Sequence, residues 1–207
     1  MPTDSMLAIP ELGGVEIHGL TRGSFILKGA LAAGAVYGAA SVGPFVRQAF
    51  AAGGGDVDIL NFALTLEYLE ADFYKKAQTL SLPANAMKMA KEFGENEQAH
   101  VDALVGTIKK LGGTPVAKPT FTFPLKKPAD FGKLAQTLED TGVSAYNGAA
   151  PAITSKEVLG AAGSIVQIEA RHAAAIRLFN SETPAPLAFD ATLQMQEVLD
   201  AVKPFIG

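Results

Sequence analysis

The chain has 207 residues, of which 48% are hydrophobic and 18% charged, and its formal net charge is −4. This composition excludes a disordered chain, and the length suits one domain with a short extra segment. The acidic balance, without a basic stripe, argues against binding of nucleic acid through its phosphates. The absence of cysteine excludes disulfides, thiolate metal sites, iron–sulfur clusters and cysteine nucleophiles.

The first quarter of the chain contains an uncharged run rich in alanine and glycine, Gly29–Val46. Basic residues precede it and the small-x-small sequence Ala49–Ala51 follows it, which is typical of a secretory signal. The segment TRGSFILK resembles a twin-arginine export motif, although Gly23 stands at the second arginine position. The acidic residues before it, Asp4 among them, argue against export.

The alternative is that this segment is retained as a small-residue helix that packs on the bundle or on a neighbouring subunit. We therefore treat residues 1–52 as an N-terminal tail that contains an export signal, an anchor or an assembly helix. We favour an extracytoplasmic or cell-envelope location over the cytoplasm. Retention favours self-association through residues 25–52, but the sequence does not define the oligomer.

Four segments with helical spacing of apolar residues follow the glycine hinge Gly53–Gly55. The first has Asp56 as a candidate N-cap, and the fourth opens with a capping box at Thr154–Glu157. A proline-rich linker between the second and third segments is long enough to cross the side of a bundle. The sequence thus predicts an all-α fold, a four-helix bundle within residues 53–207 with a long crossover between its second and third helices. The predicted helices cover about Asp56–Ala77, Pro83–Leu111, Asp130–Gly148 and Thr154–Asn180, with a short C-terminal helix near Thr192–Val202.

Two halves of the predicted bundle repeat one pattern with an offset of 72 residues. Each half contains a glutamate, a tyrosine seven residues later and, further along, a Glu-x-x-His pair. Two of the three histidines of the chain follow this rule, which makes chance a poor explanation. The matched pairs are Glu67 and Glu139, Tyr74 and Tyr146, Glu97 and Glu169, and His100 and His172.

The spacing of these residues indicates a metal site inside the bundle. Residues i and i+3 project from one helix face, so each Glu-x-x-His pair presents a carboxylate and an imidazole to one point. Glu67 and Glu139 lie within apolar helix faces, where an ionised carboxylate is costly without a cation. Four converging carboxylates repel one another unless divalent metals compensate their charge. Oxygen and imidazole donors suit iron or manganese, with zinc as a further occupant.

The chain also resembles the ferritin-like domain family, which includes bacterial and plant desiccation-related proteins. The resemblance covers about Asp56–Ile206 and rests on the segments DILNFALTLEYLEADFYKKA, GENEQAHVDAL, LEDTGVSAYNGAAP, IEARHAAAIR and EVLDAVKPFI. It implies a ferritin-like bundle that binds two iron ions, or manganese, with Glu97 and Glu169 bridging and Glu67 and Glu139 terminal. The ligand set that it implies is Glu67, Glu97, His100, Glu139, Glu169 and His172.

The metal site leads to one functional hypothesis and one alternative. The leading hypothesis is metal handling or oxidative-stress defence, with O₂ or peroxide as reactants and ferroxidase- or peroxidase-like chemistry. The alternative is a cell-envelope structural or protective protein whose bundle is an assembly scaffold, with metal structural or absent. The sequence does not establish turnover or a substrate.

Residues near the predicted ligands have weaker assignments. Tyr74 and Tyr146 are expected to hydrogen-bond metal-bound carboxylates, or to relay single electrons. Glu70 and Asp72 are expected to be solvated or paired with Lys75 and Lys76, with Glu70 as an extra ligand the less favoured interpretation.

Overall fold

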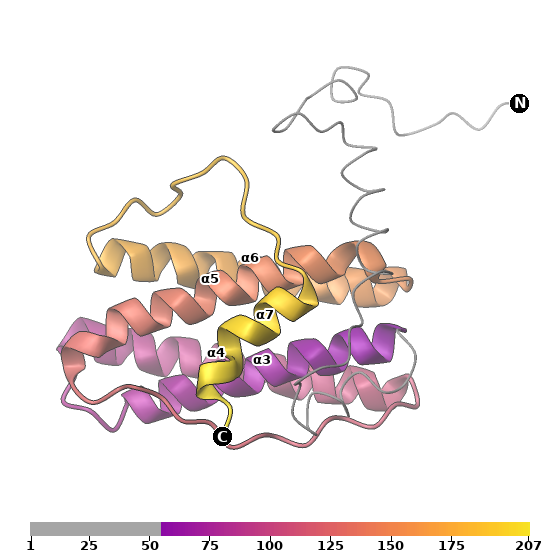
Figure 1. The fold of residues 1–207 in the computed structure, drawn as a ribbon, viewed down its shortest axis with the longest axis horizontal. Helices are drawn as coiled ribbons and strands as arrows, with labels where there is room; N and C mark the ends of the chain where they lie inside the picture. The colour runs from indigo at the N-terminus through magenta and orange to yellow at the C-terminus, as the bar shows by residue number, and fades with distance from the viewer. Residues whose placement is uncertain (1–54) are drawn as a thin grey trace, which may run out of the picture. The chain divides into compact units, whose positions relative to one another are not determined.

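The computed structural model describes residues 55–207 as a helical bundle (Figure 1). The predictions for residues 1–52 lie outside the described residues. Within residues 55–207, pairing of extended chain is limited to one isolated bridge between Phe121 and Ile206, so the predicted all-α class is confirmed. The α-helices are α3 (Asp56–Ala77), α4 (Ala84–Lys110), α5 (Phe131–Ala149), α6 (Lys156–Phe179) and α7 (Met195–Val202). Short 3₁₀ turns occupy Pro128–Asp130, Ala150–Ala152 and Lys203–Phe205.

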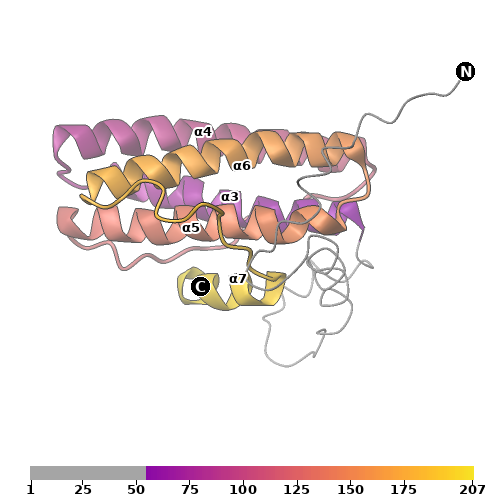
Figure 2. The same ribbon diagram turned by 90° about the horizontal axis from the view of Figure 1, so that it is seen from above.

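The four long helices α3 to α6 form the bundle. Helix α3 packs against α4 and α5, and α6 packs against α5 and α4, so each helix has two neighbours. The view from above shows α4 and α6 side by side over α3 and α5, with α7 outside the bundle against α5 (Figure 2). Because each long helix contributes one face to the interior, residues from all four can meet at the centre.

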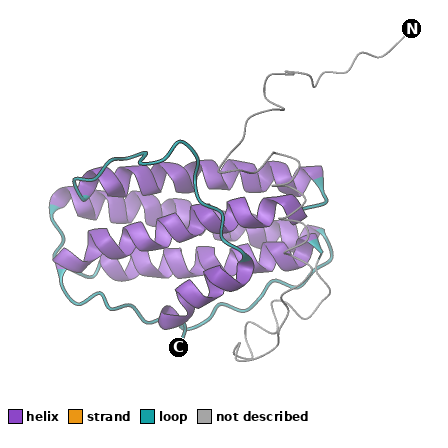
Figure 3. Ribbon diagram, turned by 45° about the horizontal axis from the view of Figure 1, so that its top comes forward, coloured by secondary structure: helices purple, strands orange, loops and turns teal. Residues whose placement is uncertain are grey.

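The crossover between α4 and α5 runs along the side of the bundle, as the linker length predicts (Figure 3). The side-chain amide of Asn61 on α3 fixes its start, accepting from the backbone N–H of Val116 and donating to the carbonyl of Thr114. Its middle pairs with the C-terminus, where the N–H of Thr122 donates to the carbonyl of Phe205 at 2.8 Å. The C-terminal segment is therefore held against the crossover.

Glycine ends α4 as the sequence predicts. Gly112 has a φ of 76°, which favours glycine, and the N–H of Gly113 donates to the carbonyl of Ile108 at 2.9 Å. The bond from the N–H of Gly112 to the carbonyl of Lys109 completes a Schellman motif. The helix stops there because the left-handed residue turns the chain into the crossover.

The predicted starts of α3 and α6 are wrong in detail. Gly55 is the N-cap of α3, and the carboxylate of Asp56 instead accepts from the backbone N–H groups of Thr154 and Ser155, both at 2.8 Å. Ser155, not Thr154, caps α6 by accepting from the N–H of Val158. Asp56 therefore joins the start of α3 to the start of α6 instead of capping its own helix, and it satisfies the N–H of the N-cap residue Ser155.

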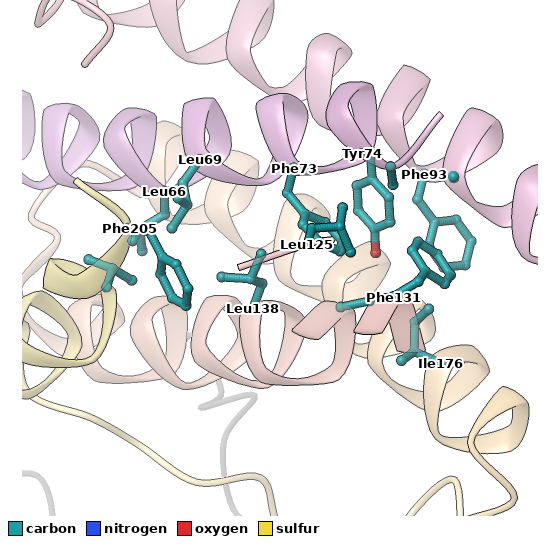
Figure 4. Packing of buried hydrophobic residues seen from close by; sticks show 14 of the residues in the cluster. Leu66, Leu69, Phe73, Tyr74, Phe93, Leu125, Phe131, Leu138, Ile176 and Phe205 are labelled. Atoms are coloured by element: carbon teal, nitrogen blue, oxygen red, sulfur yellow. The ribbon is translucent and has the colours of Figure 1, made fainter. Parts of the chain in front are cut away.

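Two hydrophobic clusters pack the bundle. One extends from α3 to α7 and includes Leu66, Phe73, Phe131 and Phe205, whose side chains lie between the helices (Figure 4). The other occupies the end of the bundle where α3 begins, and Leu64 belongs to it. None of the helices within residues 55–207 combines the length and the hydropathy that a membrane span requires.

Candidate metal centre

The structure brings all six predicted ligand residues together at the centre of the bundle. They come from α3 (Glu67), α4 (Glu97 and His100), α5 (Glu139) and α6 (Glu169 and His172). The four glutamates are completely buried and the two histidines are at most 9% exposed. Since isolated buried carboxylates are costly, four in one place require compensation.

The donors form two groups that share two residues. One group contains Glu67 and His100, the other contains Glu139 and His172, and both include Glu97 and Glu169. Within each group, one donor atom per residue lies within 4.8 Å of every other. Each group could hold one metal ion, and the residues that the two groups share are those that the family resemblance assigns as bridging.

The two imidazoles face the carboxylates through the same ring nitrogen. His100 Nδ1 lies 3.1 Å from Glu67 Oε2 and 2.9 Å from Glu97 Oε2. It also lies 3.0 Å from Glu169 Oε1. His172 Nδ1 lies 2.8 Å from Glu97 Oε1. A single Nδ1 proton cannot satisfy three carboxylates, so hydrogen bonding alone leaves the cluster undersupplied with donors.

Several of these close contacts are not aligned as hydrogen bonds. Within residues 55–207, one oxygen each of Glu97 and Glu139, both oxygens of Glu169 and Nδ1 of His172 are buried without a hydrogen-bond partner. Buried polar atoms are normally paired, and lone pairs that converge without a donor between them are suited to a cation. The residues therefore fit a metal site made of oxygen and imidazole donors.

Electrostatics support the same conclusion. Burial and the charge of neighbouring carboxylates raise the pKa of Glu67 to about 7 and that of Glu169 to about 8. Burial disfavours the charged imidazoles, but contacts with the glutamates outweigh it, raising the pKa of His100 to about 12 and that of His172 to about 10. Even with both imidazoles protonated, two positive charges face four carboxylates, which divalent cations would balance.

Both predicted tyrosines hydrogen-bond to carboxylates of the cluster. The hydroxyl of Tyr74 donates to Glu139 Oε1, and that of Tyr146 donates to Glu67 Oε1 at 2.5 Å. Each bond crosses from one half of the repeat to the other. Seven residues correspond to about 10 Å along one helix, too far to reach the glutamate of the same helix, whereas the neighbouring helix brings the other within reach.

The predicted environment of Glu70 is wrong, and so is the predicted partner of Asp72. Glu70 is only 3% exposed, and burial followed by the charge of Glu169 raises its pKa well above the usual range. Lys75 and Lys76 are exposed, and no ion pair joins them to Glu70. Asp72 is partly buried and pairs with Lys118 of the crossover. The signal for Glu70 was present, because a residue three positions after Glu67 lies on the same helix face.

Two residues that contact His172 were not predicted from the sequence. The side-chain amide of Asn96 lies 3.0 Å from Nε2 of His172. The ring of Phe93 stacks on the imidazole, with centroids 4.0 Å apart and planes inclined by 19°. Their positions, one and four residues before Glu97, place them on the inward side of α4, but only the packing of α4 on α6 selects their partner.

A four-helix bundle with a long crossover, a glutamate on each of two helices and Glu-x-x-His on the other two defines the ferritin-like class of proteins. The ferritin-like domain family matches residues 55–182, more than half of the chain, and the chain belongs to this family.

Seven chains of solved structures match the fold significantly. One is a conserved hypothetical protein from Mycobacterium tuberculosis, with a TM-score of 0.56 and 19% sequence identity. The match covers 61% of this chain and 98% of that one. No curated protein matches the sequence significantly. The comparisons thus establish the family and the fold of the chain.

Proposed function

We propose that this protein is a di-metal carboxylate protein that binds two iron ions, or manganese or zinc in their place. Its role would be metal handling or oxidative-stress defence, with O₂ or peroxide as the reactant. The observation that carries the proposal is the pair of overlapping donor groups that share Glu97 and Glu169. A single buried ion pair or a polar core would not need two carboxylates in common.

A pair of iron or manganese ions supplies one-electron redox chemistry toward O₂ or peroxide when bound. The residues of the chain have separate tasks around it. Glu67 with His100, and Glu139 with His172, would each hold one ion, and Glu97 and Glu169 would hold both. The hydroxyls of Tyr146 and Tyr74 fix the orientation of Glu67 and Glu139, as outer partners of ligands commonly do.

The surroundings support a small and weakly polar reactant. A cavity of about 20 Å³ lies beside Tyr146 and is lined by apolar side chains such as Leu66 and Leu104. This volume holds about one water-sized molecule, and its apolar lining favours O₂ over water. The hydrophobic clusters on the two sides of the glutamates keep bulk water from the donors.

Metal content per chain, by elemental analysis of protein produced with iron and manganese available, tests the proposal. Two ions per chain in the parent protein, lost in a Glu97→Ala variant that remains helical, are the expected result. Consumption of O₂ or peroxide by the reduced, metal-loaded protein would follow as a second measurement.

The absence of stoichiometric metal from a well-folded parent protein would contradict the proposal. The bundle would then be a scaffold, as in the alternative hypothesis of a structural or protective protein. The matched control is Glu157→Gln, which removes an exposed carboxylate that pairs with Lys110 at the surface and should leave the metal content unchanged.

A further inference from the structure

A fifth buried carboxylate, that of Glu70, lies outside both donor groups but near the carboxylate of Glu169. Glu70 follows Glu67 by three residues on α3 and is 3% exposed. Within residues 55–207 it makes no hydrogen bond or ion pair, and the strongest charge effects on it come from Glu169, Glu139, Glu97 and Glu67. A buried carboxylate surrounded by other carboxylates is among the most costly arrangements in a protein interior.

The repeat of the chain is broken at this position. The residue 72 positions after Glu70 is Gly142, in the middle of α5. A Cβ atom at Gly142 would lie 3.0 Å from Oε1 of Glu70 and 3.5 Å from Oε2 of Glu169. Glycine in a helix interior costs stability relative to alanine, but here it leaves space for the Glu70 carboxylate.

The carboxylate of Glu169 also lacks aligned hydrogen bonds. Both of its oxygens are buried without a hydrogen-bond partner, and Oε2 is the one that approaches Gly142. The carboxylates of Glu70 and Glu169 thus lie close to one point, and neither accepts an aligned hydrogen bond, although Nδ1 of His100 lies 3.0 Å from Glu169 Oε1. A cation that both carboxylates contact would remove this deficit.

We propose that Glu70 is a seventh ligand of the metal centre, on the Glu169 side, and that Gly142 is the residue that makes room for it. This inference rests on the proposed di-metal function. Four carboxylates balance two divalent cations, so a fifth carboxylate balances one further positive charge. Glu70 therefore favours a trivalent ion such as Fe³⁺ over a divalent ion such as Zn²⁺, since the attraction scales with the product of the charges.

The test compares the retention of Fe³⁺, supplied as the citrate complex, with that of Zn²⁺ against a competing chelator, by elemental analysis. The isosteric Glu70→Gln variant should lose Fe³⁺ about tenfold more readily than the parent, as expected for a lost ligand contact, and Zn²⁺ less than about threefold more readily. The thermal stability of the metal-free variant should equal or exceed that of the parent, because a buried carboxyl group without a hydrogen bond is replaced by a group that carries no charge at any pH.

Two further variants separate ligation from a general structural role. Gly142→Ala places a methyl group against the Glu70 carboxylate and should reproduce the selective loss of Fe³⁺ without lowering the melting temperature. The matched control is Gly163→Ala on α6, where a Cβ meets nothing within 4 Å. The exchange variant E70G/G142E moves the carboxylate to the equivalent position and should restore Fe³⁺ retention above that of Glu70→Gly alone.

The outcomes distinguish the two levels of the proposal. A parent protein that binds neither ion would overturn the proposed function and this inference together. A parent that binds both, with Glu70→Gln retaining Fe³⁺ as well as the parent, would overturn only the role of Glu70. In that case a proton shared with Glu169 would account for the two carboxylates.

Discussion

The α3–α4 and α5–α6 halves carry the same donor pattern but surround it differently. His100 of the first half lies near three glutamates, whereas His172 of the second half lies near two and is also held by Asn96 and Phe93. The residues at the equivalent positions on α6 are Ile168 and Ile165, which have no side-chain hydrogen-bonding group. A repeated set of candidate ligands can therefore have two different surroundings when only a few neighbouring residues differ.

The largest expected difference in metal binding is between a variant that loses a carboxylate shared by both donor groups and a variant that loses an unshared one. Glu169→Gln should abolish binding of both ions, because Glu169 belongs to both donor groups, while Glu139→Gln should leave one ion in the α3–α4 half. Metal counts per chain by elemental analysis distinguish the two variants. Equal losses would show that the donor groups are not separate positions.

The pH dependence of stability should be large and should change sign with metal. In the metal-free protein the pKa of Glu67 is about 7 and that of Glu169 about 8, so the native state keeps protons that unfolded glutamates release near 4.5. Stability therefore falls as the pH rises from about 4.5 to about 8.

The histidines also make the stability of the metal-free protein fall as the pH rises, over a higher range of pH. Their contribution is fully present below the unfolded value of 6.5 and is lost as the pH rises through about 10 for His172 and about 12 for His100. Metal binds deprotonated donors, so added metal should reverse the slope. Denaturant unfolding at several pH values, with a chelator or with metal, measures both slopes, and a metal-free protein that gains stability with pH would contradict the account.

Substitution of the tyrosines tests whether stability and metal binding in one half depend on the other half. Tyr74→Phe and Tyr146→Phe each remove a hydrogen bond to a carboxylate of the opposite half and should lower the free energy of unfolding by about 1 to 3 kcal/mol. In the metal-loaded protein, Tyr74→Phe should weaken the ion held by Glu139 and Tyr146→Phe the ion held by Glu67. Tyr68→Phe on α3 is the matched control, because Tyr68 is not among the hydrogen-bond partners of the cluster.

The smallest expected effect on metal affinity comes from the different surroundings of the two histidines. Asn96→Ala removes the amide at Nε2 of His172 and should weaken one of the two ions by about tenfold, leaving the other unchanged. Calorimetric titration with one kind of metal ion would resolve two binding affinities and show which of them the substitution lowers. Asn85→Ala, an exposed change on the same helix, should move neither, and a shift of both affinities in Asn96→Ala would contradict inequivalent positions.

The positions of the helices and the identity of the candidate donors follow from local patterns in the amino-acid sequence. The apolar spacing within Asp56–Ala77 and the Gly112–Gly113 signal locate helix boundaries because they are local properties of the backbone. The 72-residue repeat predicted which six residues meet, since residues i and i+3 of a helix always share a face and each such face had to be buried.

The surroundings of those donors depend on how the helices pack and could not be predicted from local patterns. Glu70 was expected near Lys75 and Lys76, but the glycine at position 142 of α5 lets it enter the interior. The tyrosines pair across the halves, and Asp72 pairs with Lys118 of the crossover, because neighbours in space come from segments far apart in the chain. A helical period defines the face on which a residue lies, whereas its burial and its partner depend on the side chains that the packed neighbour presents or lacks.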